Sequence, residues 1–166
     1  GAEGLSIYCG LYALSSLSEH KAAQQSAILI VPGFTEANMQ YLELISELLK
    51  NGFGPVYIYD HRGQGQSGRF KNPPKEQIAT IDKSDNYVQD FATVLSVVGD
   101  DLFKRNPGYK LSIVSHSMGS QIVLNALSRP LPDAIYKIES HVMISPLIAI
   151  RLGFPLDQLA DSGRIN

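Results

Sequence analysis

The sequence predicts an α/β fold, in which helices cover both faces of a mostly parallel β-sheet. Two observations lead to this prediction. Short apolar runs, such as AILIV at residues 27–31, are typical of strands that are buried on both faces. Between these runs, apolar residues recur at helical spacing, with glycine or proline at the joins. With 166 residues, of which 44% are hydrophobic, the chain is long enough for one compact domain.

The first half of the chain contains three candidate strands and one candidate helix. Residues 5–14 are rich in β-forming side chains, and the apolar runs at 27–31 and 55–60 predict buried strands. From residue 38 to 51 the apolar positions have helical spacing, and an Asn-Gly pair then stops the helix. This order of elements is that of a β-α-β unit with parallel strands.

The second half alternates in the same way. The longest candidate helix covers residues 86–105, with Ser84 or Asp85 as the expected N-cap. Two further buried strands are predicted at residues 110–114 and 139–145, with another helix between them. Four buried strands alternating with helices complete the α/β prediction.

Composition excludes several classes of function. The net charge is −2 without a long block of one sign, so a nucleic-acid surface is not expected. Cys9 is the single cysteine, which excludes an intrachain disulfide, and we expect it to be a buried, inert thiol. No apolar run approaches the roughly 20 residues of a spanning helix, and the first residues lack the features of a signal peptide.

The segment SHSMG, residues 115–119, lies where a parallel α/β sheet places its ligands, at the carboxyl end of a strand. A strand precedes it and a helix follows it, so Ser117 is predicted to project from a sharp turn as a nucleophile. Such a turn requires small residues at both ends, and Ser115 and Gly119 meet this need. The N–H group of Met118, at the start of the helix, is a candidate oxyanion donor. The alternative is an ordinary serine-rich turn, which the strand before it and the helix after it disfavour.

A second oxyanion donor is expected from the loop after an earlier strand. VPGFTE, residues 31–36, occupies that place. Gly33 allows a close backbone approach, and the Phe34 N–H is the candidate donor. The alternative for this loop is a plain strand-ending turn.

The glycines of DHRGQGQSGR, residues 60–69, have the spacing of a dinucleotide fingerprint. That fingerprint needs a helix starting at its third glycine, and here Pro73 and Pro74 forbid the helix. We therefore reject nucleotide binding. The glycines instead form a tight loop after the second buried strand, which Asp60 and Arg62 are expected to tie together by hydrogen bonds.

Together, the segments VPGFTEANMQYLELISELLKNGF, YDHRGQGQSGR and VSHSMGSQIVL resemble the α/β-hydrolase superfamily. More narrowly, they are similar to bacterial lysophospholipases of the monoacylglycerol-lipase-like branch. The resemblance covers about residues 27–154. It implies that Ser117 is the nucleophile, that Phe34 and Met118 supply the oxyanion N–H groups, and that Glu36 braces the oxyanion loop. Ser115 stands where glycine or alanine is common in this branch, and Ser120 where a second glycine often follows.

The resemblance also implies an activity and its setting. We expect a serine-dependent ester hydrolase that forms an acyl-enzyme on lipid or acyl-ester substrates, with no metal and no organic cofactor. The expected location is the cytoplasm or the periphery of the bacterial inner membrane. A non-catalytic hydrolase-like domain for binding or scaffolding is the alternative.

The sequence lacks an obvious acid and base for Ser117. His141 is the single histidine after Ser117, and its place at the start of a strand predicts the sheet edge opposite the site. His61 and His20 are not expected to be bases either. We therefore expect an inactive, partial hydrolase fold, with a core at residues 1–145 and the start of a lid, or a helix packed on the core, at 146–166. Its open sheet edge is expected to favour self-association.

Overall fold

The computed structural model describes residues 1–14, 26–69, 83–129 and 138–148. The strands are β1 (Cys9–Tyr12), β2 (Ser26–Val31), β3 (Val56–Tyr59), β4 (Lys110–His116) and β5 (Ile138–Ile144). The helices are η1 (Ala2–Gly4), η2 (Asn38–Tyr41), α1 (Leu42–Lys50), α2 (Ser84–Arg105) and α3 (Met118–Leu127). Every predicted element that falls in the described residues is present.

The strands form one sheet in the order β1-β3-β2-β4-β5. β1 runs antiparallel to β3, and the other neighbouring pairs are parallel. From the central strand β2 the chain passes through α1 to β3 on one side, and then through α2 to β4 on the other. The carboxyl end of β2 is therefore a point where the strand order reverses, which is where such sheets bind ligands. The predicted mostly parallel α/β sheet is confirmed.

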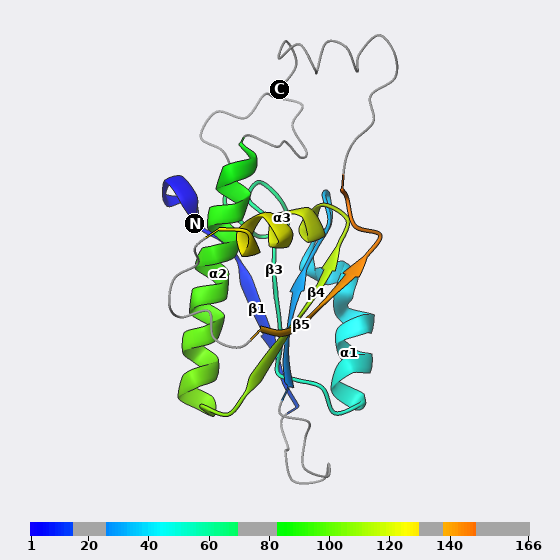
Figure 1. The fold of residues 1–166 in the computed structure, drawn as a ribbon. Helices are drawn as coiled ribbons and strands as arrows, with labels where there is room; N and C mark the ends of the chain where they lie inside the picture. The colour runs from blue at the N-terminus through cyan, green and yellow to red at the C-terminus, as the bar shows by residue number, and fades with distance from the viewer. Residues whose placement is uncertain (15–25, 70–82, 130–137, 149–166) are drawn as a thin grey trace.

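Helices cover both faces of this sheet, α1 on one side and α2 and α3 on the other (Figure 1). The side chains of β2 show why its sequence is continuously apolar. Leu29 and Val31 belong to the core beneath α2 and α3, whereas Ile28 and Ile30 pack with Ile45 of α1. Because successive side chains point to opposite faces, both sets must be apolar.

Three local expectations differ from the structure. The segment predicted as one helix from residue 38 begins as the 3₁₀-helix η2. The N-cap of α2 is Lys83 and has no side-chain cap, so Ser84 and Asp85 lie within the helix. Cys9 is exposed rather than buried, because β1 is an edge strand. Neighbouring residues still desolvate its thiol in part, which raises the pKa to about 11. A thiol with such a pKa is largely protonated at neutral pH and is a weak nucleophile.

The other edge strand, β5, exposes consecutive apolar side chains. Val142, Met143 and Ile144 are 52%, 43% and 46% exposed. Of the predicted segment 146–166, only residues 146–148 are described, so the expected lid lies mostly outside the described residues, as does His20. Among the helices that the structure describes, none is long and apolar enough to cross a membrane.

Candidate active site

Ser117 occupies the junction between β4 and α3, with φ 48° and ψ −117°. A positive φ is strained for a residue with a side chain and needs support from its surroundings. That support comes partly from the end of β5. The Ser117 N–H donates to the Ile144 carbonyl over 3.0 Å, and the Ser117 carbonyl accepts the N–H groups of Leu147 and Ser120 at 3.0 and 3.1 Å.

Gly119 explains how α3 approaches the central strand so closely. A Cβ at this position would lie 2.4 Å from the carbonyl oxygens of both Val31 and Pro32. Only glycine fits there without moving the backbone. The N-terminus of α3, which begins at Met118, therefore lies against the carboxyl end of β2. The first N–H groups of a helix have no partner within the helix and remain available as donors.

The loop after β2, residues 32–36, is called the β2 loop below. It lies beside the Ser117 turn because Val31 pairs with Ser115 in the register of β2 and β4. Within it, Thr35 has a positive φ of 63°. The Phe34 side chain is 38% exposed, and its N–H has no hydrogen-bond partner among the described residues.

Glu36 connects the β2 loop to the Ser117 turn. Its carboxylate accepts the N–H of Gly33, the hydroxyl of Tyr41 at 2.5 Å, and the Nδ1–H of His116 at 2.7 Å. Partial burial alone would raise the pKa of Glu36, but the donors from Tyr41, Gly33 and His116 outweigh it and lower the pKa. Glu36 is therefore ionised and draws the three donors together.

His61, at the end of β3, lies beneath the β2 loop. It is 1% exposed, and its Nε2 lies 2.8 Å from the Pro32 carbonyl oxygen, to which Nε2–H donates. The ring packs edge-to-face against Tyr59, with centroids 5.0 Å apart, and Tyr87 lies 5.7 Å away. Desolvation lowers the pKa of His61, so the ring is neutral at ordinary pH.

His141 does not lie where the sequence predicted. β5 starts at Ile138, so His141 stands in the middle of the strand rather than at its start. Its Nε2 lies 2.7 Å from Ser115 Oγ, which is also 2.8 Å from Ser120 Oγ. The expected position at the opposite sheet edge is therefore wrong. Ser115 and Ser120 form a polar cluster with His141 beside the Ser117 turn. Desolvation lowers the pKa of this histidine.

The loop after β3, residues 60–69, is tied together by Asp60. Its two carboxylate oxygens accept the backbone N–H groups of Asn38 at 2.7 Å and Gln66 at 2.8 Å. Ser67 donates to the Asp60 carbonyl and accepts the Tyr8 N–H. These bonds attach the loop to the start of η2 and to the segment before β1.

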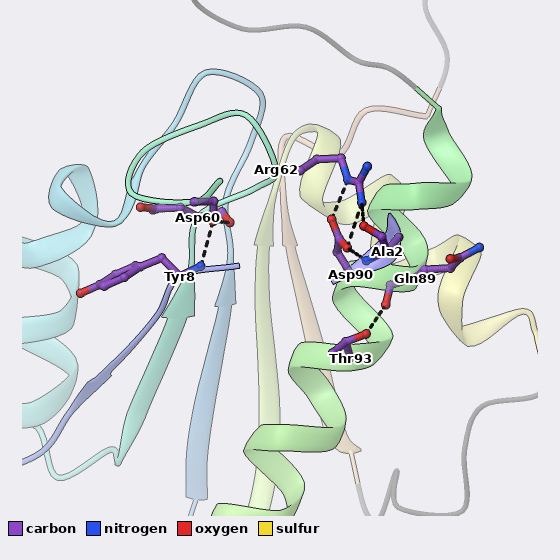
Figure 2. Close-up of polar contacts among 8 residues, drawn as sticks. Ala2, Tyr8, Asp60, Arg62, Gln89, Asp90 and Thr93 are labelled. Carbon is purple, nitrogen blue, oxygen red and sulfur yellow. Dashed lines mark hydrogen bonds and ion pairs between the residues drawn. The ribbon is translucent and has the colours of Figure 1, made fainter. Parts of the chain in front are cut away.

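Arg62 connects the same loop to a different part of the structure. It points away from Asp60 and toward α2, where its Nε lies 2.7 Å from Asp90 Oδ2 (Figure 2). Its Nη2 donates to Asp90 Oδ1 at 3.2 Å and to the Ala2 carbonyl at 3.0 Å. Asp60 therefore holds the loop together by hydrogen bonds, as expected, whereas Arg62 connects the loop to α2 and to Ala2. The two side chains anchor opposite sides of the loop.

Several residues of this site were not singled out from the sequence. Tyr41 and Asp90 lie on helices whose amphipathic pattern drew attention to their apolar neighbours alone. A carboxylate such as Asp90 on the apolar face of a helix is a usable signal, since a buried charge requires a partner. Within the described ranges, no group of three or more His, Cys, Asp or Glu side chains is arranged to hold a metal ion.

Comparison with known proteins places this geometry in a family. Residues 22–162 match the family described as serine aminopeptidase, S33. Lysophospholipase L2 of Escherichia coli is 35% identical over 102 residues, which cover 61% of this chain and 28% of that protein. The probable lysophospholipase L2 of Haemophilus influenzae is 28% identical over 140 residues, covering 84% of this chain and 41% of that protein. The chain thus spans less than half of the length of these relatives.

Solved structures agree on the fold. A monoacylglycerol lipase of Paleococcus ferrophilus superposes with a TM-score of 0.60 at 23% identity, over 96% of this chain and 51% of that one. A carboxyl esterase of Bacillus coagulans superposes with a TM-score of 0.58 at 18% identity, over 95% and 46%. The structure is therefore a partial α/β-hydrolase fold that spans about half of these neighbours. The chain belongs to the serine aminopeptidase S33 family of α/β hydrolases.

Proposed function

We propose that this chain carries the nucleophile and the oxyanion site of a serine-dependent carboxylic ester hydrolase of the lysophospholipase or monoacylglycerol lipase type. Ser117 is the nucleophile, and the backbone N–H groups of Phe34 and Met118 are the oxyanion donors. The backbone of Ser117, strained at φ 48° and ψ −117° between β4 and α3, is the observation that carries the proposal. The names of the relatives support the substrate class.

In this reaction, Ser117 Oγ attacks the acyl carbonyl carbon while its proton passes to a base. The carbonyl electron pair moves onto oxygen, and the resulting oxyanion accepts the N–H groups of Phe34 and Met118. Collapse of this intermediate expels the alcohol, which takes up the proton, and leaves an acyl-enzyme. Water then attacks the acyl-enzyme, releases the fatty acid and restores the Ser117 hydroxyl.

The described histidines do not supply the base in this arrangement. Hydrogen bonds hold His61 against the Pro32 carbonyl, His116 against Glu36, and His141 against Ser115. We therefore propose that these 166 residues alone hydrolyse esters at a negligible rate, because loss of a triad member removes most of the activity. The same observation favours a second candidate, a non-catalytic domain that keeps the hydrolase core for binding or scaffolding.

A turnover assay separates the two candidates. Fatty-acid release from a monoacylglycerol and from a lysophospholipid is measured for the 166-residue chain and for any longer native product that contains it. The hydrolase proposal predicts turnover in the longer product that Ser117→Ala abolishes. Ser128→Ala, at an exposed serine after α3, is the matched control and leaves turnover unchanged.

Absence of turnover in every folded product would favour the non-catalytic domain. Robust hydrolysis by the 166 residues alone, lost in Ser117→Ala, would show that one of the present histidines is the base. No metal or organic cofactor enters the proposed chemistry. Peripheral contact with a lipid surface follows as a further proposal from the class of substrate, and self-association follows from the exposed apolar edge at β5.

A further inference from the structure

The peptide unit between Pro32 and Gly33 is held at both ends by side chains from different parts of the chain. His61 Nε2–H donates to the Pro32 carbonyl oxygen of this unit over 2.8 Å, and the Gly33 N–H of the same unit donates to the Glu36 carboxylate. We propose that His61 is a positioning residue which, together with Glu36, clamps this peptide unit and thereby directs the next N–H, that of Phe34, toward Ser117. This inference rests on the proposed function, in which Phe34 is an oxyanion donor.

The planarity of the peptide bond explains why two contacts are enough. Fixing the carbonyl oxygen and the N–H of one peptide unit fixes the orientation of its whole plane. The direction of the following N–H then depends on the backbone torsions of Gly33, for which glycine has the widest choice. The hydrogen bond from the Gly33 N–H to Glu36 restrains these torsions, because it closes residues 33–36 into a turn. Without a clamp, the Phe34 N–H would sample many directions. Stabilisation of an oxyanion is strongest when its donors are already oriented before the reaction.

The surroundings of His61 suit it to a fixed contact rather than to proton transfer. The ring is 1% exposed and is enclosed by Tyr59 and Tyr87. A carbonyl oxygen accepts only from a protonated nitrogen, so the contact with Pro32 places the proton of the neutral ring on Nε2. A general base for Ser117 would need a nitrogen facing the substrate, and the burial of His61 prevents this.

The Glu36 end of the clamp reaches the nucleophile. The same carboxylate accepts His116 Nδ1–H at 2.7 Å, and His116 immediately precedes Ser117. Tyr41, at the end of η2, holds Glu36 from the other side at 2.5 Å. The clamp therefore joins the ends of β2, β3 and β4, the three strands whose carboxyl ends surround the proposed site.

Nuclear magnetic resonance of the 166-residue chain tests the clamp without any activity. We expect the imidazole nitrogen-15 shifts of His61 to report a neutral ring with its proton on Nε2. A coupling across the hydrogen bond should join this nitrogen to the Pro32 carbonyl carbon. A proton on Nδ1, or no coupling in a folded chain, would overturn the clamp.

Variants then test what the clamp does. His61→Leu removes the donor, His61→Gln retains one, and Tyr59→Phe is the control, since it removes a buried hydroxyl without a partner beside the same ring. The readouts are the Gly33 amide resonance of the 166-residue chain and the rate at which a fluorophosphonate labels Ser117 in a longer native product that contains it. For His61→Leu we expect a shifted Gly33 resonance and a maximal labelling rate lower by about tenfold or more, with an unchanged half-saturating concentration.

The other variants and outcomes complete the test. His61→Gln should recover most of the rate, and Tyr59→Phe should match the wild type. A folded His61→Leu chain with the wild-type rate would overturn the positioning role. If wild-type Ser117 is not labelled in any folded longer product, the proposed function fails, and the resonance experiment alone decides whether His61 and Glu36 hold the peptide. The resonance experiment on the wild-type chain also decides whether the clamp exists if His61→Leu does not fold.

Discussion

Replacing Asp90 with asparagine tests whether a buried ion pair joins the loop after β3 to α2. The side chains of Arg62 and Asp90 are 1% and 2% exposed. Asp90 accepts Arg62 Nε at 2.7 Å and the Ala2 N–H at 2.6 Å. Asparagine has the same shape but no charge, and its NH₂ group would face the donors of Arg62. The guanidinium would then be buried without a counter-charge.

The expected loss follows from this burial. Breaking a buried ion pair by removing one partner destabilises a protein by about 3–5 kcal/mol. Domains have a free energy of unfolding of about 5–15 kcal/mol, so Asp90→Asn is expected to remove a large share of the stability. Arg62→Met should reduce stability by a similar amount, since it leaves the Asp90 carboxylate buried without its counter-charge. The double variant Arg62→Met/Asp90→Leu removes both charges and should lose much less than the sum of the single changes.

Urea unfolding followed by circular dichroism measures these differences. The matched control is Asp85→Asn, also on α2, which breaks an exposed pair with Arg129, a residue after α3. In that pair the N···O distance is 2.8 Å, and the side chains of Asp85 and Arg129 are 65% and 46% exposed. Such a pair contributes less than about 1 kcal/mol. Equal losses for Asp90→Asn and Asp85→Asn would refute the reasoning, as would a double variant that loses the full sum.

Three further predictions concern other parts of the structure. Gly119→Ala places a methyl group 2.4 Å from two carbonyl oxygens. We therefore expect the free energy of unfolding to fall by about 1–3 kcal/mol and Ser117 to be labelled more slowly. Asn125→Ala, on the exposed face of α3, is the control. Wild-type behaviour of Gly119→Ala would contradict the close approach. The pKa of His61 is lowered in the folded state, so on acidification the unfolded state takes up a proton at a higher pH than the folded state does. Stability should therefore fall as the pH drops below about 6.5, by at most about 1.4 kcal/mol per pH unit. His61→Gln should remove this component of the slope in unfolding curves, and an unchanged slope would count against a buried neutral ring. Finally, Val142→Lys on the exposed edge strand β5 should reduce self-association in sedimentation velocity, whereas a monomeric wild type would refute association through this edge.

The order of elements could be predicted from the sequence because the central strands β2 and β3 are buried on both faces. Continuous apolar runs at β2 and β3 have no other common explanation in a chain with helical segments between them. The position of Ser117 between a strand and a helix was predictable for the same reason. The N-cap of α2 was not, because tertiary contacts can start a helix without a capping side chain.

Contacts between distant residues could not be predicted in the same way. The pairing of Arg62 with Asp90 depends on how α2 crosses the end of β3, which no local pattern in the sequence encodes. The contact of His141 with Ser115 depends on the register of β4 and β5, and a small error in the start of a strand moves a side chain along the sheet. Burial of His61 beneath the β2 loop likewise arises only when the ends of β2 and β3 meet.

Labelling with a fluorophosphonate, followed by peptide mapping, tests most directly whether Ser117 is an activated nucleophile. The probe is applied to the folded chain and to any longer native product that contains it, with Ser117→Ala as the control. The account predicts a single adduct in the longer product, on Ser117 and not on the neighbouring Ser115 or Ser120, which is lost in Ser117→Ala. An unlabelled Ser117 in every folded product, or an adduct that persists in Ser117→Ala, would contradict it.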